Sequence, residues 1–60
     1  MNQEKYNFFK KEQLPIFKAI YKNAGAYRKK ELKRSLFENK NLTEKQKEDF
    51  WNLVCEKENN

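Results

Sequence analysis

The sequence has no histidine and only one cysteine, Cys55, among its 60 residues. Histidine is the side chain that most often acts as an acid or base near neutral pH and that most often binds transition metals. A lone cysteine cannot form a disulfide within the chain, and it has no partner at the spacing of a zinc site. Ser35 and Cys55 also lack an activating neighbour in the sequence. We therefore expect a protein that is not an enzyme and that uses no metal or cofactor.

Glycine and proline occur once each, and uninterrupted apolar runs are no longer than three residues. A single glycine excludes a glycine-rich phosphate-binding loop. The apolar runs are far shorter than the roughly 20 residues that a membrane-spanning helix needs, so no membrane partner is expected. Residues 1–11 lack the apolar segment of a signal peptide. Together with the unpaired cysteine, these absences favour a cytoplasmic location.

Residues that favour strands are scarce as well. Only four side chains are β-branched, whereas Lys, Glu, Leu and Ala, which favour helices, are frequent. A chain this short forms a single domain with a small core and a stability of roughly a few kcal/mol. The sequence therefore predicts one all-α domain over residues 1–60, a small bundle of three helices or of four if a short N-terminal helix is separate.

The first helical segment is difficult to interpret at Pro15. At the angular step of a helix, one apolar stripe keeps its phase on both sides of this residue. Proline inside a helix costs about 3 kcal/mol, whereas in a first turn it costs almost nothing. We therefore predict a short helix over residues 3–12 and another over 15–23, with a single helix that is kinked at Pro15 as the alternative. Gly25 is then predicted to adopt the left-handed conformation that follows a helix. The stripe consists of Tyr6, Phe9, Phe17, Ile20, Tyr21 and Ala24.

A further helix is predicted over residues 26–38. Lys29 and Lys33 border its apolar side, where their aliphatic stems can cover the edge of the core while the ammonium groups reach water. The apolar side itself consists of Ala26, Leu32, Leu36 and Phe37.

The last helix is predicted to begin at Thr43. Thr43 and Gln46 have the spacing of a capping box, in which each side chain bonds the free backbone amide of the other residue. Acidic residues in the early turns are favoured by the helix dipole. Residues 56–60 are expected to fray. The apolar side consists of Phe50, Trp51, Leu53 and Val54.

Positive charge is distributed unevenly. The first forty residues contain eleven Lys or Arg and four acids, a net of +7, and the last twenty contain three and five, a net of −2. The basic residues are densest over residues 28–34. A surface of one sign steers encounters with oppositely charged partners, so we expect an acidic partner. Lysine outnumbers arginine twelve to two, however, and codon bias in an A/T-rich genome would produce the same excess without any role in binding.

Two aromatic residues fall outside the predicted apolar sides. Phe8 lies away from the stripe of the first segment, and Tyr27 lies on the polar side of its helix, next to Arg28. Exposed aromatic residues beside basic ones are typical of the positions that dominate protein–protein binding. The candidate partner-binding residues are Phe8, Lys18, Lys22, Tyr27, Arg28, Lys30 and Arg34.

These features support three hypotheses. The first is a small regulatory or inhibitory protein that binds an acidic surface of another protein through a basic, aromatic-bearing helix face over residues 27–34. The second is a nucleic-acid-binding regulator that uses the same helix. A helix–turn–helix matches poorly, because it needs a small residue where Tyr21 stands and buried apolar residues where Glu31 and Arg34 stand. Looser binding through phosphate contacts needs only basic residues on one face. The third is self-association that completes a marginal core.

Overall fold

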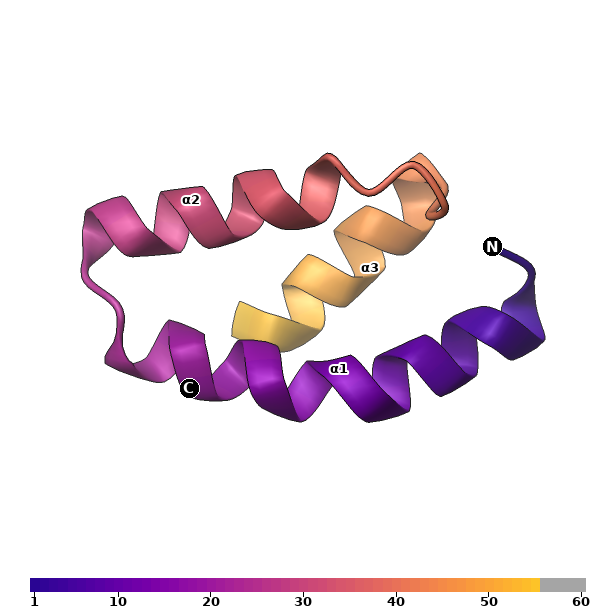
Figure 1. Ribbon diagram of the computed structural model, residues 1–60, viewed down its shortest axis with the longest axis horizontal. Coiled ribbons are helices and arrows are strands. Elements are labelled where there is room, and N and C mark those ends of the chain that lie inside the picture. The colour runs from indigo at the N-terminus through magenta and orange to yellow at the C-terminus, as the bar shows by residue number, and fades with distance from the viewer. Residues whose placement is uncertain (56–60) are drawn as a thin grey trace.

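The computed structural model describes residues 1–55, and within them it contains three α-helices and no strand. Helix α1 spans Gln3–Asn23, α2 spans Ala26–Phe37 and α3 spans Glu44–Cys55. Helices α1 and α2 run antiparallel, and α3 crosses between them and packs against both (Figure 1). The predicted all-α bundle is confirmed, with three helices rather than four. The predicted fraying of residues 56–60 lies outside the described residues.

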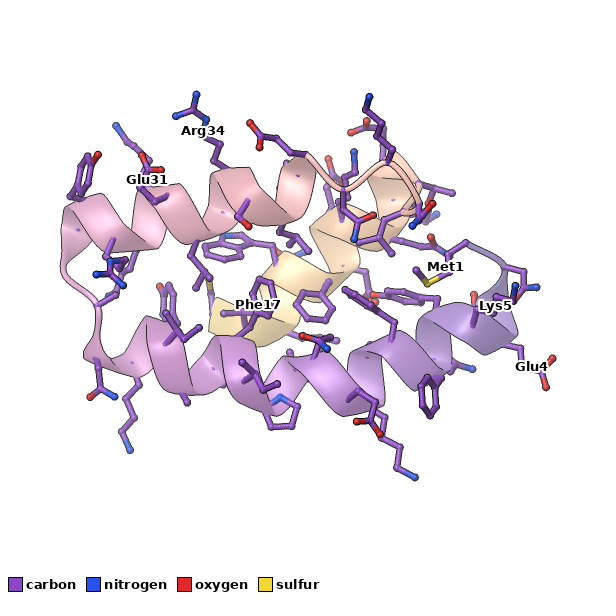
Figure 2. The ribbon with its side chains drawn as sticks, in the orientation of Figure 1. Met1, Glu4, Lys5, Phe17, Glu31 and Arg34 are labelled. Carbon is purple, nitrogen blue, oxygen red and sulfur yellow. The ribbon has the colours of Figure 1, made fainter. Side chains whose placement is uncertain are left out.

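Helix α1 continues through Pro15, so the prediction of two helices over 3–12 and 15–23 was wrong and the single-helix alternative is correct. Pro15 lies on the exposed side of α1, where water can reach the backbone carbonyl that loses its helical partner. On the other side, Phe9 and Phe17 both pack against Phe50 of α3, with ring centroids 5.3 and 5.0 Å apart. Figure 2 shows Phe17 pointing from α1 toward α3. Because the ring of Phe50 contacts Phe9 before the proline and Phe17 after it, packing stabilises the continuous helix and offsets the cost of about 3 kcal/mol for a proline inside a helix.

Gly25 does not take the left-handed conformation that the sequence predicted. Its φ of −82° and ψ of −177° are those of ordinary extended backbone, and the residue is the N-cap of α2. Helix α1 ends at Asn23, and its C-cap, Ala24, is also extended; the Ala24 backbone N–H donates a hydrogen bond to the Tyr21 carbonyl oxygen at 3.2 Å. Two consecutive extended residues therefore reverse the chain direction, and no residue with positive φ is needed.

The core is small and centres on Phe50, which is completely buried. Two residues of the predicted apolar sides lie elsewhere, since Ala26 is exposed and Ile20 is 38% exposed. Their positions at the end of the α1–α2 connection and at the edge of α1 keep them out of the interface with α3. Leu42, in the loop before α3, is buried although no periodic pattern includes it. The buried apolar residues are Tyr6, Leu36, Leu42, Phe50 and Val54.

The predicted capping box at the start of α3 is present. The Gln46 N–H donates to Thr43 Oγ1 at 3.0 Å, and the Thr43 N–H donates to Gln46 Oε1 at 3.0 Å. The Gln46 Nε2 group also donates to the carbonyl oxygen of Met1 at 2.7 Å, and the amino group of Met1 donates to the carbonyl oxygen of Asn41. The cap therefore also attaches the segment before α1 to the start of α3.

A polar contact between α1 and α3 sets the position of the two helices. The Tyr6 hydroxyl donates to Asp49 Oδ2 at 2.7 Å and lies 3.2 Å from the carbonyl oxygen of Gln46. Lys10 Nζ lies 3.8 Å from Asp49 Oδ2 and 4.8 Å from the centre of the Tyr6 ring. Burial, then the hydrogen bond to Asp49, then the charge of Asp49 raise the pKa of Tyr6 above its ordinary value. Tyr6 is thus held as a neutral donor, and this contact is part of the fold.

Candidate interaction surfaces

The structure divides the seven predicted contact residues between two separate surfaces. Four belong to the outer side of α2 and three to the outer side of α1. We call the first group, Tyr27, Arg28, Lys30 and Arg34, the α2 face. The α1 group consists of Phe8, Lys18 and Lys22.

Tyr27 is the most prominent residue of the α2 face. Its side chain is 76% exposed, the highest value among the large apolar residues of the described chain. Arg28 and Lys30 are also exposed, and neither forms an ion pair within residues 1–55. The sequence prediction that Tyr27 lies outside the core is confirmed, and two unpaired cations stand within three residues of it.

Arg34 differs from the other residues of the α2 face because it is paired within its own helix. Its Nη1 atom lies 3.8 Å from Glu31 Oε2 and its Nε atom lies 3.5 Å from Glu38 Oε2. Figure 2 shows Glu31 and Arg34 pointing away from the bundle, on the side of α2 opposite α1. The outer ridge of α2 therefore carries both signs of charge, which the count of basic residues in the sequence did not reveal.

Lys29 and Lys33 lie where the sequence placed them, at the edge of the core. Lys29 Nζ is 4.4 Å from the centre of the Tyr21 ring, and Lys33 Nζ is 5.7 Å from the centre of the Phe37 ring. Such cation–π contacts direct the ammonium groups toward aromatic faces. Arg28 and Lys30 are therefore the cations of α2 that stay available to a partner.

The first turn of α2 adds to this positive charge. Gly25 supplies no side-chain cap, the first turn contains no acid, and Arg28 is its third residue. The positive end of the helix dipole and a cationic side chain thus lie together, an arrangement that costs the helix a few tenths of a kcal/mol or more.

Three large apolar side chains of α1 are exposed, and the sequence analysis singled out only Phe8 among them. Phe8 is 65% exposed, as predicted, and Ile16 is 51% exposed. Ile20 is 38% exposed, and the smaller residues Pro15 and Ala19 are exposed as well. At about 100° per residue, Ile16 and Ile20 lie on either side of Phe9, whereas Phe8 lies about 80° or more farther round the helix. The three large apolar side chains therefore do not form one continuous stripe.

Two hollows lie along α1, one near each end. An open groove with a volume of about 840 Å³ lies beside Phe8, between it and the segment that contains Met1. At the other end, Ile20 and Arg28 line a hollow of about 350 Å³ at the connection between α1 and α2. Arg28 therefore lies at the connection between α1 and α2, next to the exposed side chain of Ile20.

Neither a metal site, nor a membrane-spanning helix, nor a similar protein assigns a role to these two surfaces. Within residues 1–55 no group of three or more His, Cys, Asp or Glu is arranged to hold a metal ion. None of the described helices has the length and apolar character needed to cross a membrane. Comparisons with protein-family models, curated proteins and solved structures find no significant match to this chain.

Proposed function

We propose that the protein is a small non-enzymatic regulator or inhibitor that binds an acidic surface of a partner protein through the α2 face. The observation that carries this proposal is Tyr27, exposed to 76% with Arg28 and Lys30 beside it. Tyrosine and arginine are enriched among the few interface residues that supply most of the binding energy. An exposed aromatic ring also contributes a large contact area at little cost in conformational entropy.

The ion pairs of Arg34 refine which residues carry the binding. Arg34 must leave Glu31 and Glu38 before it can pair fully with a partner, so part of its gain is lost. Arg28 and Lys30 have no such competitor within residues 1–55. Tyr27, Arg28 and Lys30 are therefore the primary contacts, and Arg34 is secondary.

A protein partner fits the α2 face better than a nucleic acid does. Glu31 and Glu38 stand on the same outer ridge as Arg34, and their carboxylates repel a phosphate backbone. A protein surface can place a basic or polar group opposite each glutamate and an acid opposite Arg28 or Lys30. The experiment must therefore distinguish a protein partner from a nucleic acid.

The test compares two triple variants of the full chain as affinity baits in an extract of the native host. In the first, Tyr27, Arg28 and Lys30 are all replaced by Ala, which should release the specific partner with a loss of at least about 2 kcal/mol, or roughly thirtyfold in affinity. The control replaces Lys5, Lys40 and Lys45 by Ala, which removes three exposed charges that are not among the candidate contacts, and it should retain the partner. Retention of the same partner by the first variant would overturn the proposal.

A gel-shift assay with random duplex DNA separates the two kinds of partner. Phosphate contacts weaken with salt at a log–log slope of about −0.9 per contact. The proposal predicts that any retardation at low salt is the same for the wild type and for the variant that lacks Tyr27, Arg28 and Lys30. A steep salt-dependent shift that these substitutions abolish would assign the α2 face to nucleic acid instead.

A further inference from the structure

The open groove of about 840 Å³ beside Phe8 is used neither by the fold nor by the proposed function. It lies along the N-terminal part of α1, and its apolar wall consists of Met1, Phe8 and Phe9. Phe8 is 65% exposed, and Met1 and Phe9 are half-buried. Apolar surface that gathers in one hollow marks an interaction site more often than scattered single residues do. We call this hollow the Phe8 groove.

The charged residues that line the Phe8 groove are Glu4, Lys5 and Glu12, so carboxylates outnumber ammonium groups there. All three are exposed, and none of them forms an ion pair within residues 1–55. The chain as a whole has a net charge of +5, which makes the groove an acidic site on a basic protein. Its complement is therefore a segment that carries an apolar or aromatic side chain together with positive charge.

The α2 face of the same chain has this chemistry, but it lies too far away to reach the groove within one molecule. Tyr27 is 76% exposed, and it follows the connection between α1 and α2. Phe8 lies about 22 Å along the helix axis from Asn23, the last residue of α1. Figure 2 shows Glu4 and Lys5 at one end of the bundle, and the α1–α2 connection lies at the other end. The two surfaces can therefore meet only between two copies of the chain.

We propose that the α2 face of one copy docks into the Phe8 groove of a second copy. The Tyr27 ring enters the hollow beside Phe8, where a pair of aromatic rings gains more than its buried area alone provides. Arg28 and Lys30, which have no ion pair within residues 1–55, then face the carboxylates of the groove. The contact joins two different surfaces, so it is heterologous.

Self-association of this kind is weak and has a consequence for the proposed function. The net charge of +5 on each copy opposes association and the contact is small, so we expect a Kd of about 0.1–1 mM. A docked copy covers the α2 face, so a second copy and an acidic partner compete for the same residues. This competition rests on the proposed function, whereas the self-association does not.

Analytical ultracentrifugation of the full chain tests the association. We expect the weight-average mass at about 1 mM protein to be at least about 1.4 times that at about 20 µM, as a Kd in this range requires. Amide NMR spectra over the same dilution locate the contact. The amides of Phe8 and Glu12 in the groove, and of Tyr27 and Arg28 on the α2 face, should shift with concentration.

Two double variants of the full chain remove opposite halves of the contact, with helicity checked by circular dichroism. The first, Tyr27→Ala with Arg28→Gln, should stay monomeric even though it lowers the net positive charge that opposes association. The second, Phe8→Ala with Glu12→Gln, should stay monomeric as well.

A matched control makes the second variant specific. Ile16→Ala with Glu48→Gln also removes one exposed apolar side chain and one exposed carboxylate that forms no ion pair within residues 1–55. Neither position belongs to the groove or to the α2 face, so the control should associate like the wild type.

A mixture of the two double variants gives the sharpest test. The variant at Tyr27 and Arg28 keeps an intact groove, and the variant at Phe8 and Glu12 keeps an intact α2 face. Neither associates alone, but together they can form one complete contact. We expect a 1:1 complex whose Kd lies within about threefold of the wild-type value.

Several outcomes contradict the proposal. These are a mass that stays constant up to about 1 mM, a control that loses as much association as the variant at Phe8 and Glu12, and a mixture that stays monomeric. Dilution shifts that map to Ile16 and Ile20 instead of the groove would assign the association to another side of α1 and would overturn it too.

The failure of this inference is distinguishable from the failure of the proposed function. The variant at Phe8 and Glu12 keeps Tyr27, Arg28 and Lys30, so as an affinity bait it should capture the partner at least as well as the wild type. If the chain never self-associates but loses its partner when the α2 face is replaced, only this inference is wrong. Self-association without a partner that depends on the α2 face would show the reverse.

Discussion

Helices α2 and α3 are both twelve residues long, yet they are stabilised in different ways. Helix α3 begins with a capping box and an acid in its first turn, and it buries Phe50, Val54 and the stem of Lys47. Helix α2 begins with an uncapped glycine and no acid, and it buries only Leu36. Local interactions and packing both favour α3, whereas α2 depends mainly on its contacts with the other two helices.

The difference separates the helix that contributes most to the stability of the domain, α3, from the helix that exposes more of its side chains, α2. Helix α3 lies between α1 and α2 (Figure 1), and seven of its twelve residues are buried or half-buried. Helix α2 has one side in the bundle, and its outer side carries Tyr27 and the unpaired cations. Regions that bind partners are often drawn from the less stable part of a structure. In this protein the exposed, uncapped helix is the one to which we assign binding.

The largest effect is expected from Phe50→Ala. The substitution removes a fully buried ring and its contacts with both Phe9 and Phe17, which costs about 3–5 kcal/mol. That is of the same order as the total stability of roughly a few kcal/mol, so the variant should be largely unfolded at 25 °C. Leu32→Ala, at a half-buried position of α2, should remain folded. Circular dichroism during thermal unfolding measures both, and a Phe50→Ala melt within a few degrees of the wild type would contradict the central role of α3.

An intermediate effect is expected from Thr43→Ala. The variant loses the side chain that accepts the Gln46 N–H, at a cost of about 1 kcal/mol. In a domain of this size such a loss lowers Tm by about 4–8 °C. Thr43→Ser keeps the hydroxyl and should melt close to the wild type. If both variants lose the same amount, the methyl group rather than the cap is responsible.

The smallest effect, and one of opposite sign, is expected from Gly25→Asp. The extended backbone of Gly25 suits any residue, and no atom lies within 4 Å of the position where a Cβ would stand. An aspartate there caps α2, faces the positive end of its dipole and restricts the unfolded chain, for a gain of up to about 1 kcal/mol. Denaturant unfolding measures the gain, with Gly25→Asn as the uncharged control. The same change adds a negative charge near Arg28, so it should weaken binding to an acidic partner while it stabilises α2. A stabilised variant with unchanged binding would argue against Arg28 as a contact.

The candidate surfaces could be predicted only in part. Tyr27 and Phe8 are identifiable from the sequence because each falls outside the helical periodicity of its apolar neighbours. The exposure of Ile16 and Ile20 was not predictable in the same way, because both lie next to Phe9 on α1 and only the packing against α3 leaves them outside the core. The ion pairs of Arg34 with Glu31 and Glu38 have helical spacing and were visible in principle, although the count of basic charges obscured them.

The sequence by itself determined the features that depend on near neighbours along the chain. These are the helical class, the limits of α2 to within a residue, and the capping box of Thr43 and Gln46, all of which follow from contacts within one or two turns. Only the tertiary structure decided whether α1 breaks at Pro15 and how Gly25 turns the chain. The reason is energetic: the ring of Phe50, 33 residues beyond Phe17, outweighs the local preference of proline, and no pattern within α1 contains that contact.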